Sequence, residues 1–294
     1  MTALAQRNLV PEILDGLAAD DVRARRSRRD LARINALMFQ ALIMASLMRK
    51  FLPRPPRRIL EIGAGDGTFM LKVARRMARD WREVELTMLD RVGLVTPKLK
   101  ADFAGLGWTV ETVTADVFDW AEKADGGSFD AITVNLFLHH FDDDGLLRLF
   151  SLLRRKARLI LATEPLRAGL ALAATRLLPA IGANGVTRHD AAHSVRAGFR
   201  GTELSDIWSA AGGRPLEERR AGPFSHVFVG AGVGAPAAGS TTGYGAAPTP
   251  SPSPQGGGGL SQALPTANRG SLAPERGERR AAAPPCGEGL GVGV

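Results

Sequence analysis

Apolar and polar positions follow two different periods along most of the chain. Short runs with β-type alternation or continuous apolar character are separated by segments whose apolar residues recur every three to four positions. The first pattern predicts strands and the second predicts helices. Strands are expected at 57–62, 83–90, 108–116, 129–138 and 157–165, and helices at 68–80, 142–157 and 201–213. Strands that alternate with helices favour parallel βαβ units, and 214–222 and 224–232 can close the sheet as a hairpin around Gly222 and Pro223.

The two ends of the chain have other patterns. Apolar residues between 31 and 48 lie on one face of a helix, which the prolines at 53, 55 and 56 end. From about 233 the sequence is of low complexity, and it lacks the apolar surface needed to offset chain entropy. We therefore predict a helical cap at 1–52, an α/β domain at 53–232 and a disordered tail at 233–294.

The first predicted strand leads into a glycine loop, IGAGDG, with glycines at 63, 65 and 67. A dinucleotide fingerprint would require a further glycine where Thr68 stands, and a phosphate-binding loop would end in Gly-Lys-Ser/Thr, which this loop lacks. The strand also carries Glu61, whose negative charge disfavours a phosphate and suits a cationic ligand.

With this loop the chain resembles the class I S-adenosylmethionine-dependent methyltransferases, whose first motif places an acidic residue before G-x-G-x-G. The resemblance implies a Rossmann-like, doubly wound, seven-stranded α/β sheet with S-adenosylmethionine as the cofactor. It implies that Glu61 holds the ammonium side of the methionine portion. The most similar members are small-molecule methyltransferases of the ubiquinone/menaquinone type and related bacterial groups.

The resemblance extends to the ends of the next three strands. It implies that Asp90 accepts from both ribose hydroxyls, that Asp116 accepts from the adenine amino group, and that Asn135 lies beside the transferred methyl group. The residues expected to contact the cofactor are Glu61, Gly63, Ala64, Gly65, Gly67, Asp90, Arg91, Asp116, Val117, Asn135 and Leu136.

Two groups of polar residues are candidates for the chemistry. His139 and His140 follow the fourth strand, where either can act as a general base; the alternative is that they shape the pocket or cap the next helix. Arg188, His189 and Arg196 lie in the segment that often covers the substrate in this family, and their alternative is a solvated helix surface.

A metal site is not expected. His189 and His193 have i, i+4 spacing, but HDAAH differs from the zinc motif HExxH and a third ligand is not apparent.

The resemblance implies methyl transfer to a small acceptor that is phenolic, quinone-like or polyketide- or lipid-like, on oxygen or carbon. Two alternatives stay open: a non-catalytic S-adenosylmethionine-binding regulatory or assembly protein, and a protein or nucleic-acid methyltransferase. The fourth strand ends in NLFL rather than the D/N-P-P-Y/F of DNA amino-methyltransferases, which argues against a DNA substrate.

Composition refines the expected partners. The net charge is +8, but the arginines are scattered without interleaved aromatic residues, so a nucleic-acid partner is not expected. A single cysteine and the absence of a secretory pattern lead us to expect a cytoplasmic protein. The apolar helix at 31–52 is expected to pack on the core, with a pocket lid or a peripheral membrane contact as alternatives.

Overall fold

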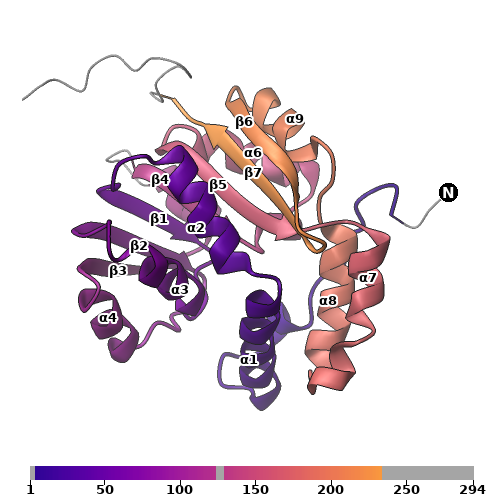
Figure 1. Cartoon of the computed structure of the whole chain (residues 1–294). Coiled ribbons are helices and arrows are strands. Elements are labelled where there is room, and N and C mark those ends of the chain that lie inside the picture. Colours follow the sequence, from indigo (N-terminus) through magenta and orange to yellow (C-terminus); the bar gives the residue numbers. More distant parts are fainter. Residues whose placement is uncertain (1–3, 124–128, 234–294) are drawn as a thin grey trace, which may run out of the picture. The chain divides into compact units, whose positions relative to one another are not determined.

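The structure is a computed structural model that describes residues 4–123 and 129–233. All of these residues belong to one compact unit (Figure 1). The tail predicted from residue 233 lies, apart from Val233 itself, outside the described residues.

A seven-stranded sheet forms the centre of this unit, with the order β3-β2-β1-β4-β5-β7-β6 among the described strands. Five parallel strands are followed by an antiparallel hairpin, as the late strand pattern predicted. The order reverses between β1 and β4, and in such sheets ligands bind at this point, outside the carboxyl ends of the strands. The predicted doubly wound α/β sheet is confirmed. The strands are β1 (Arg58–Ile62), β2 (Val84–Asp90), β3 (Trp108–Thr114), β4 (Phe129–Asn135), β5 (Ala157–Pro165), β6 (Arg214–Ala221) and β7 (Ser225–Ala231).

Helices cover both faces of the sheet and bury two apolar clusters. On one face α2 (Gln40–Phe51), α3 (Thr68–Met77) and α4 (Pro97–Ala104) pack around buried side chains such as Met48 and Phe103. On the other face α5 (Val117–Lys123), α6 (Asp143–Leu153) and α9 (Glu203–Ala210) enclose Phe150 and Trp208. The short helices α4 and α5 were not predicted from the sequence.

The predicted continuous helix over 31–52 is wrong. Residues Val22–Leu37 form α1, and the chain then turns at Phe39, which has a left-handed backbone (φ 56°), before α2 begins. The two helices are bent by 57°. The break lets α2 pack on the sheet while α1 turns toward the carboxyl ends of the strands (Figure 1). Among the described residues, no single helix is long and apolar enough to cross a membrane, and the α1–α2 pair satisfies the length and composition only jointly.

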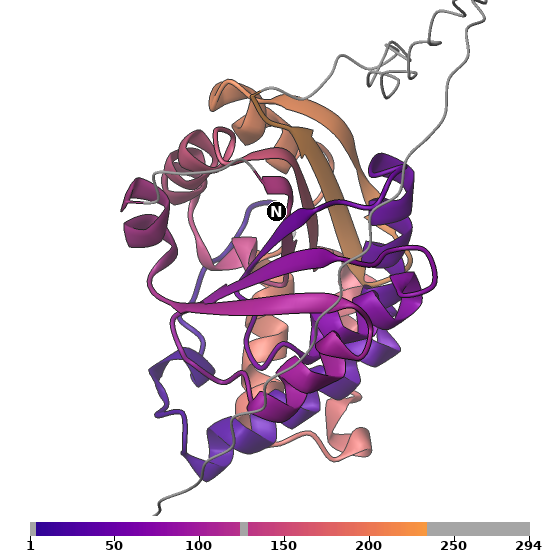
Figure 2. The ribbon, with the colours of Figure 1, turned by 90° about the vertical axis from the view of Figure 1, so that its left-hand side faces the viewer.

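A second group of elements covers the same edge of the sheet. Between β5 and α9 the chain forms α7 (Gly169–Thr175), the 3₁₀ turn η3 (Leu178–Ile181) and α8 (Gly185–Ala197). Helix α8 packs on both α7 and α1, and these helices lie side by side in Figures 1 and 2. The N-terminal segment 4–21, which contains the 3₁₀ turn η1 (Leu14–Gly16), runs along α8.

Candidate active site

The glycine loop after β1 is shaped for the close approach of a ligand. Gly63 has a left-handed backbone (φ 69°), and a Cβ atom there would lie 2.6 Å from the Phe137 side chain. Gly65 is also left-handed (φ 57°), but a Cβ atom there would meet nothing within 4 Å. The open space beside Gly65 is therefore on the ligand side of the loop, which fits a cofactor lying against the backbone.

Glu61 contributes a buried negative group beneath this loop. Its side chain is 2% exposed, and Oε2 has no hydrogen-bond partner among the described residues. Burial, and then the negative charges of Asp90 and Asp66, raise the pKa of Glu61 well above its usual value. An unpartnered buried carboxyl group favours a cationic ligand, because a cation restores the lost solvation of the charged form. The ammonium group of S-adenosylmethionine meets this requirement.

The acidic residues after β2 and β3 fix the backbone around the crevice. Asp90 accepts hydrogen bonds from the backbone N–H of Gly65 (2.8 Å) and of Val92 (2.8 Å). Asp116 accepts from the N–H of Phe118 (2.8 Å) at the start of α5. A carboxylate has about four acceptor sites, so both residues keep capacity for hydroxyl or amino donors of a ligand. At the end of β4, Oδ1 of Asn135 accepts from the Thr163 hydroxyl (2.8 Å), and among the described residues its NH₂ group has no acceptor, so that it can donate into the cavity.

A cavity of about 1190 Å³ joins these residues to the covering helices. It is lined by every residue expected to contact the cofactor except Gly67, which packs on Leu99 and Met88 instead. Ligand pockets usually measure about 300–1,000 Å³, so this cavity has room for a cofactor and a second molecule. Most of the residues that line the cavity from α1, α7, η3 and the N-terminal segment are apolar, among them Leu31, Ile34, Ala174, Leu178, Leu9 and Leu14, and the polar Arg28, Asn35 and Thr175 stand among them.

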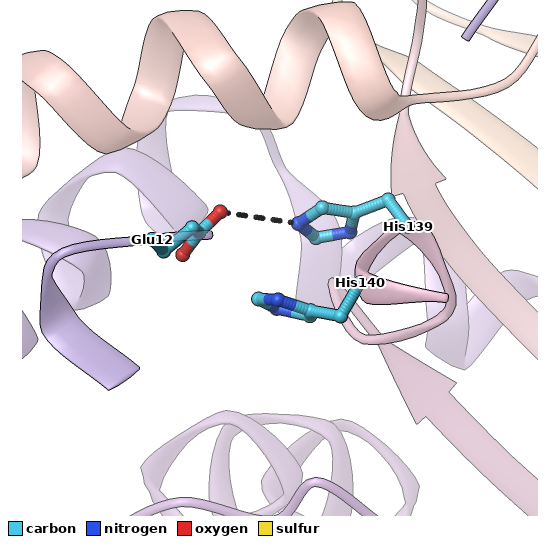
Figure 3. Close-up of side chains that lie close together, drawn as sticks. All are labelled: Glu12, His139 and His140. Carbon is cyan, nitrogen blue, oxygen red and sulfur yellow. Dashed lines mark ion pairs between the residues drawn. The ribbon is translucent and has the colours of Figure 1, made fainter. Parts of the chain in front are cut away.

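Both candidate histidines line this cavity, in the 3₁₀ turn η2 (Leu138–His140) that follows β4. His139 is 4% exposed and lies between two carboxylates. Its Nδ1 is 2.7 Å from Oε2 of Glu164, and its Nε2 is 3.5 Å from Oε1 of Glu12 (Figure 3). Burial lowers the pKa of His139, but the hydrogen bonds with Glu12 and Glu164 outweigh it and raise the pKa to about 9. His139 is therefore protonated at neutral pH.

His140 has the opposite electrostatic environment. Burial, and then the positive charge of His139, lower the pKa of His140 below its usual value. The two rings lie 4.4 Å apart, and Nδ1 of His140 is 3.4 Å from Oδ2 of Asp15. A neutral imidazole at the cavity wall can accept a proton, which the charged His139 cannot do.

The N-terminal segment delivers Glu12 to this site and is held by several hydrogen bonds. Arg7 donates to the backbone oxygens of Phe141 (2.7 Å) and Ala197 (2.9 Å). Asp190 of α8 accepts from the N–H groups of Ile13 (2.9 Å) and Leu14 (3.0 Å). Glu12 also accepts from the Ser194 hydroxyl. Burial raises the pKa of Glu12, but its contacts with the histidines and Ser194 lower it to about 2.

Glu12, Asp15 and Glu164 were missed by the sequence analysis. Glu164 carried a usable signal, because it is an acidic residue at the carboxyl end of β5, next to the other polar strand ends. It also accepts from the N–H groups of Phe137 (3.0 Å) and Leu138 (2.9 Å), and so fixes the turn that carries the histidines. Glu12 and Asp15 lie outside any regular pattern.

Arg188, His189 and Arg196 do not line the main cavity. With Arg176 they line a separate groove of about 490 Å³ between α7 and α8. The cavity therefore gives no support to the predicted substrate contacts of these three residues. His193, on the same helix, does line the cavity, and its buried Nδ1 has no hydrogen-bond partner among the described residues. The same holds for Oδ1 of Asn35 on α1, so both atoms are candidates for contacts with an acceptor.

Glu12, His139 and His140 also offer donor atoms within 4.8 Å of one another, a spacing that a metal ion can bridge. These donors already have protein partners: Glu164 for His139, Asp15 for His140 and Ser194 for Glu12. We therefore retain the prediction that the site works without a metal. The rings of the other histidine pair, His189 and His193, are tilted by 41° with their centroids 4.4 Å apart.

Comparisons with known proteins agree with this geometry. A family model described as "Methyltransferase domain" matches residues 59–158, which run from the second residue of β1 past β4 and include every residue expected to contact the cofactor. A comparison with curated proteins found no match.

Many solved structures share the fold, and three serve as examples. An O-methyltransferase family protein from Burkholderia thailandensis is 19% identical with a TM-score of 0.52, and the match covers 72% of this chain and 60% of that one. The S-adenosylmethionine-dependent methyltransferase SibL is 20% identical with a TM-score of 0.53, covering 76% and 63%. The riboflavin-derivative dimethyltransferase RosA from Streptomyces davawensis is 17% identical with a TM-score of 0.50, covering 76% and 62%. The chain thus spans less than two thirds of these proteins, and the likeness shows the fold.

The domain match starts within the strand that carries Glu61 and continues through the glycine loop, Asp90, Asp116 and the histidine turn. The unpartnered carboxyl group beneath the loop suits the ammonium group of S-adenosylmethionine. Residues 59–158 therefore match a methyltransferase domain, and the described fold is similar to that of S-adenosylmethionine-dependent methyltransferases, which supports S-adenosylmethionine as the cofactor.

Proposed function

We propose that the protein transfers a methyl group from S-adenosylmethionine to a small phenolic, quinone-like or polyketide-like acceptor, on oxygen or carbon. The observation that carries this proposal is the single cavity that joins the cofactor loop to the two histidines beneath an apolar helical wall. A small, largely apolar molecule suits such a wall, whereas a folded protein or a nucleic acid requires an open surface. The intact cofactor residues favour an enzyme over a non-catalytic binding module.

The cofactor supplies a methyl group on a sulfonium, which an attacking oxygen or carbon takes as the sulfur–carbon bond breaks. The chain's own residues position the reactants: Glu61 binds the ammonium group, Asp90 holds the ribose, and Asp116 the adenine. His140 accepts the proton that the acceptor loses, because its lowered pKa keeps it neutral. His139 is a positioning residue, held between Glu164 and Glu12, that sets the place of the neighbouring ring.

The first test is binding. Calorimetry should show binding of S-adenosylmethionine and of its demethylated product, with NAD binding weakly. Asp90→Ala should weaken binding by roughly 10- to 100-fold, because ribose hydroxyls lose a charged acceptor and the loop loses its anchor at Gly65. Asp119→Ala, on the exposed side of α5, is the matched control. A preference for NAD would contradict the proposal.

The second test is turnover. The protein is incubated with methyl-labelled cofactor and a panel of orcinol, methylhydroquinone and a reduced naphthoquinone, and the labelled product is identified by mass spectrometry. Methylated product above the Asp90→Ala background supports the proposal. Tight cofactor binding without transfer to any member of the panel would contradict the proposed acceptor class.

A further inference from the structure

Exposed apolar side chains gather on the helices that cover the cavity. Of the twelve large apolar residues that are exposed in the described part of the chain, seven lie on α1, α2, α7, η3 or their short links. The seven are Val22, Leu37, Phe39, Leu42, Leu170, Leu177 and Ile181. Scattered exposed apolar residues are ordinary, but a gathering on neighbouring elements marks an interaction surface.

Three of these residues stand at the mouth of the cavity. Leu37, Leu177 and Ile181 line the cavity and are also 60%, 68% and 43% exposed. Phe39 is 65% exposed and follows Met38, which lines the cavity as well. The apolar interior of the site is therefore continuous with an apolar outer surface.

The same helices carry a strong positive charge. Helix α1 contains six arginines, at positions 23, 25, 26, 28, 29 and 33, and a single acidic residue, the buried Asp30. Asp21, just before the helix, is paired with Arg23. On the other side of the mouth, Arg176 and Arg188 are exposed in the groove between α7 and α8. The acidic residue of α8, Asp190, is buried and engaged by the N-terminal segment.

We infer that the cavity mouth, formed by α1, the Phe39 corner and the α7–η3 segment, docks on the surface of an anionic lipid bilayer. Arginines around exposed leucines and a phenylalanine match both parts of such a surface: anionic headgroups attract the guanidinium groups, and the acyl boundary accepts the apolar side chains. The proposed contact is peripheral, because α2 packs on α3 and β5 and α1 packs on α8. In Figure 1 these helices lie together at one end of the unit, below the sheet.

Docking has a consequence for the acceptor, which rests on the proposed methyl transfer. With the mouth against the bilayer, an acceptor that is dissolved in the lipid enters the cavity without crossing water. Its polar ring reaches the histidines, while an alkyl or isoprenoid chain stays along Leu31, Ile34 and Leu178. The acceptor class is thus an amphiphile with a phenolic or quinol head.

Vesicle sedimentation tests the docking by itself. The full chain is mixed with phosphatidylcholine vesicles that contain or lack phosphatidylglycerol. We expect binding to the anionic vesicles, weakened by salt because the attraction is screened. Phe39→Asp and Leu170→Asp, at exposed positions outside the cavity lining, should each reduce the bound fraction by about tenfold. Aspartate tolerates the left-handed backbone at residue 39, so the fold should persist. Leu147→Asp, exposed on α6, is the matched control and should bind as the native chain does.

The outcomes separate the two proposals. Equal binding to neutral and anionic vesicles, no binding to either, or unchanged binding by both variants would overturn the docking surface. A dimer in solution that both variants dissociate would also overturn it, because the face would then be an interface between copies. Cofactor binding and transfer to orcinol do not depend on the mouth and should survive in both variants. For the acceptor class, 5-pentadecylresorcinol in anionic vesicles should be methylated more efficiently than orcinol. Equal rates would refute the proposal that the acceptor is an amphiphile.

Discussion

His139 and Glu12 form an ion pair across the cavity, with Nε2 of the histidine 3.5 Å from Oε1 of the glutamate (Figure 3). The pair joins the N-terminal segment to the turn after β4, and on its far side the same imidazole contacts Glu164 at 2.7 Å. The contact between the N-terminal segment and the turn after β4 therefore depends on the charge of one histidine.

Glu12→Gln should destabilise the protein in a pH-dependent way. The folded pKa of His139 is raised from 6.5 to about 9, so its contribution is complete below pH 6.5 and is lost as pH rises through 9. The pKa of Glu12 is lowered from 4.5 to about 2, so its contribution is complete above pH 4.5 and is lost as pH falls through 2. Urea unfolding should show that the variant's free energy of unfolding is lower than that of the native chain by about 1–3 kcal/mol. The difference should be largest between pH 4.5 and 6.5, where both contributions are complete. Glu122→Gln, an exposed carboxylate paired with Arg148, should show little deficit at any pH.

His140→Ala and His139→Ala should have different effects. His140→Ala removes the neutral base, so it should lower kcat for a phenolic acceptor by about 10²- to 10⁴-fold. It should also remove the acidic limb of the pH profile and leave cofactor affinity unchanged. His139→Ala should mainly destabilise the fold, since it leaves Glu12 and Glu164 without their shared cation. Turnover against pH and thermal melting distinguish the two, with His189→Ala in the outer groove as the control. An unchanged pH profile in His140→Ala would remove it from the chemistry.

Glu61→Gln should stabilise the unliganded protein and weaken cofactor binding. Burial raises the pKa of Glu61 well above its usual value, so the ionised form is costly until a cation arrives. For the same reason, binding of the cofactor's ammonium group should release a proton. Calorimetry in buffers of different ionisation enthalpy measures this release, and the variant should lack it. A lower melting temperature for the unliganded variant would contradict the assignment of a cation site.

Gly63→Ala and Gly65→Ala should distinguish an effect on protein stability from an effect on cofactor binding. Both positions have a left-handed backbone, which costs an alanine about 1 kcal/mol. At Gly63 the new methyl group also meets Phe137, so the total loss should reach about 2–4 kcal/mol. At Gly65 it meets only the cavity, so the main effect should be weaker cofactor binding. Chemical unfolding and calorimetry on both variants provide the comparison, and a larger stability loss at Gly65 would contradict it.

Chelators should leave activity unchanged. Glu12, His139 and His140 each have a protein partner, so their spacing is explained by ion pairs and hydrogen bonds. Dialysis against EDTA and then phenanthroline, followed by turnover measurements, checks this expectation. Loss of activity that returns with a divalent cation would show that the three residues are metal ligands.

The sheet was predictable from local patterns, and so was the gathering of the expected cofactor residues, except Gly67, at one cavity. Alternation defined the strands, and the polar residues at their ends became neighbours once the strands were parallel. The break at Phe39 was not predictable from periodicity, since residues on both sides keep helical spacing. Glu12 was missed for a different reason. Its partners lie 127 and 182 positions along the chain, and no short-range pattern marks such a contact.

Helix α8 shows a second feature of the site that residue spacing in the sequence could not predict. Its pattern predicted that His189 and His193 share a face, as they do. It did not show that the cavity wall runs between them, so that His193 lines the cavity and His189 lines the outer groove. That boundary is set by where α1 and the N-terminal segment pack on α8.

The anchoring of the N-terminal segment on α8 also orders events during synthesis. Arg7 and Ile13 leave the ribosome early, but their partners Ala197 and Asp190 are made 190 and 177 residues later. At about 5–20 residues per second, the segment remains without these contacts for roughly 10–40 s. The glycine loop and the parallel strands are made within that interval, so a nascent chain can assemble the cofactor-binding half before Glu12 reaches His139. The contacts that cover the cavity therefore wait for α8, although the N-terminal segment that makes them is synthesised first.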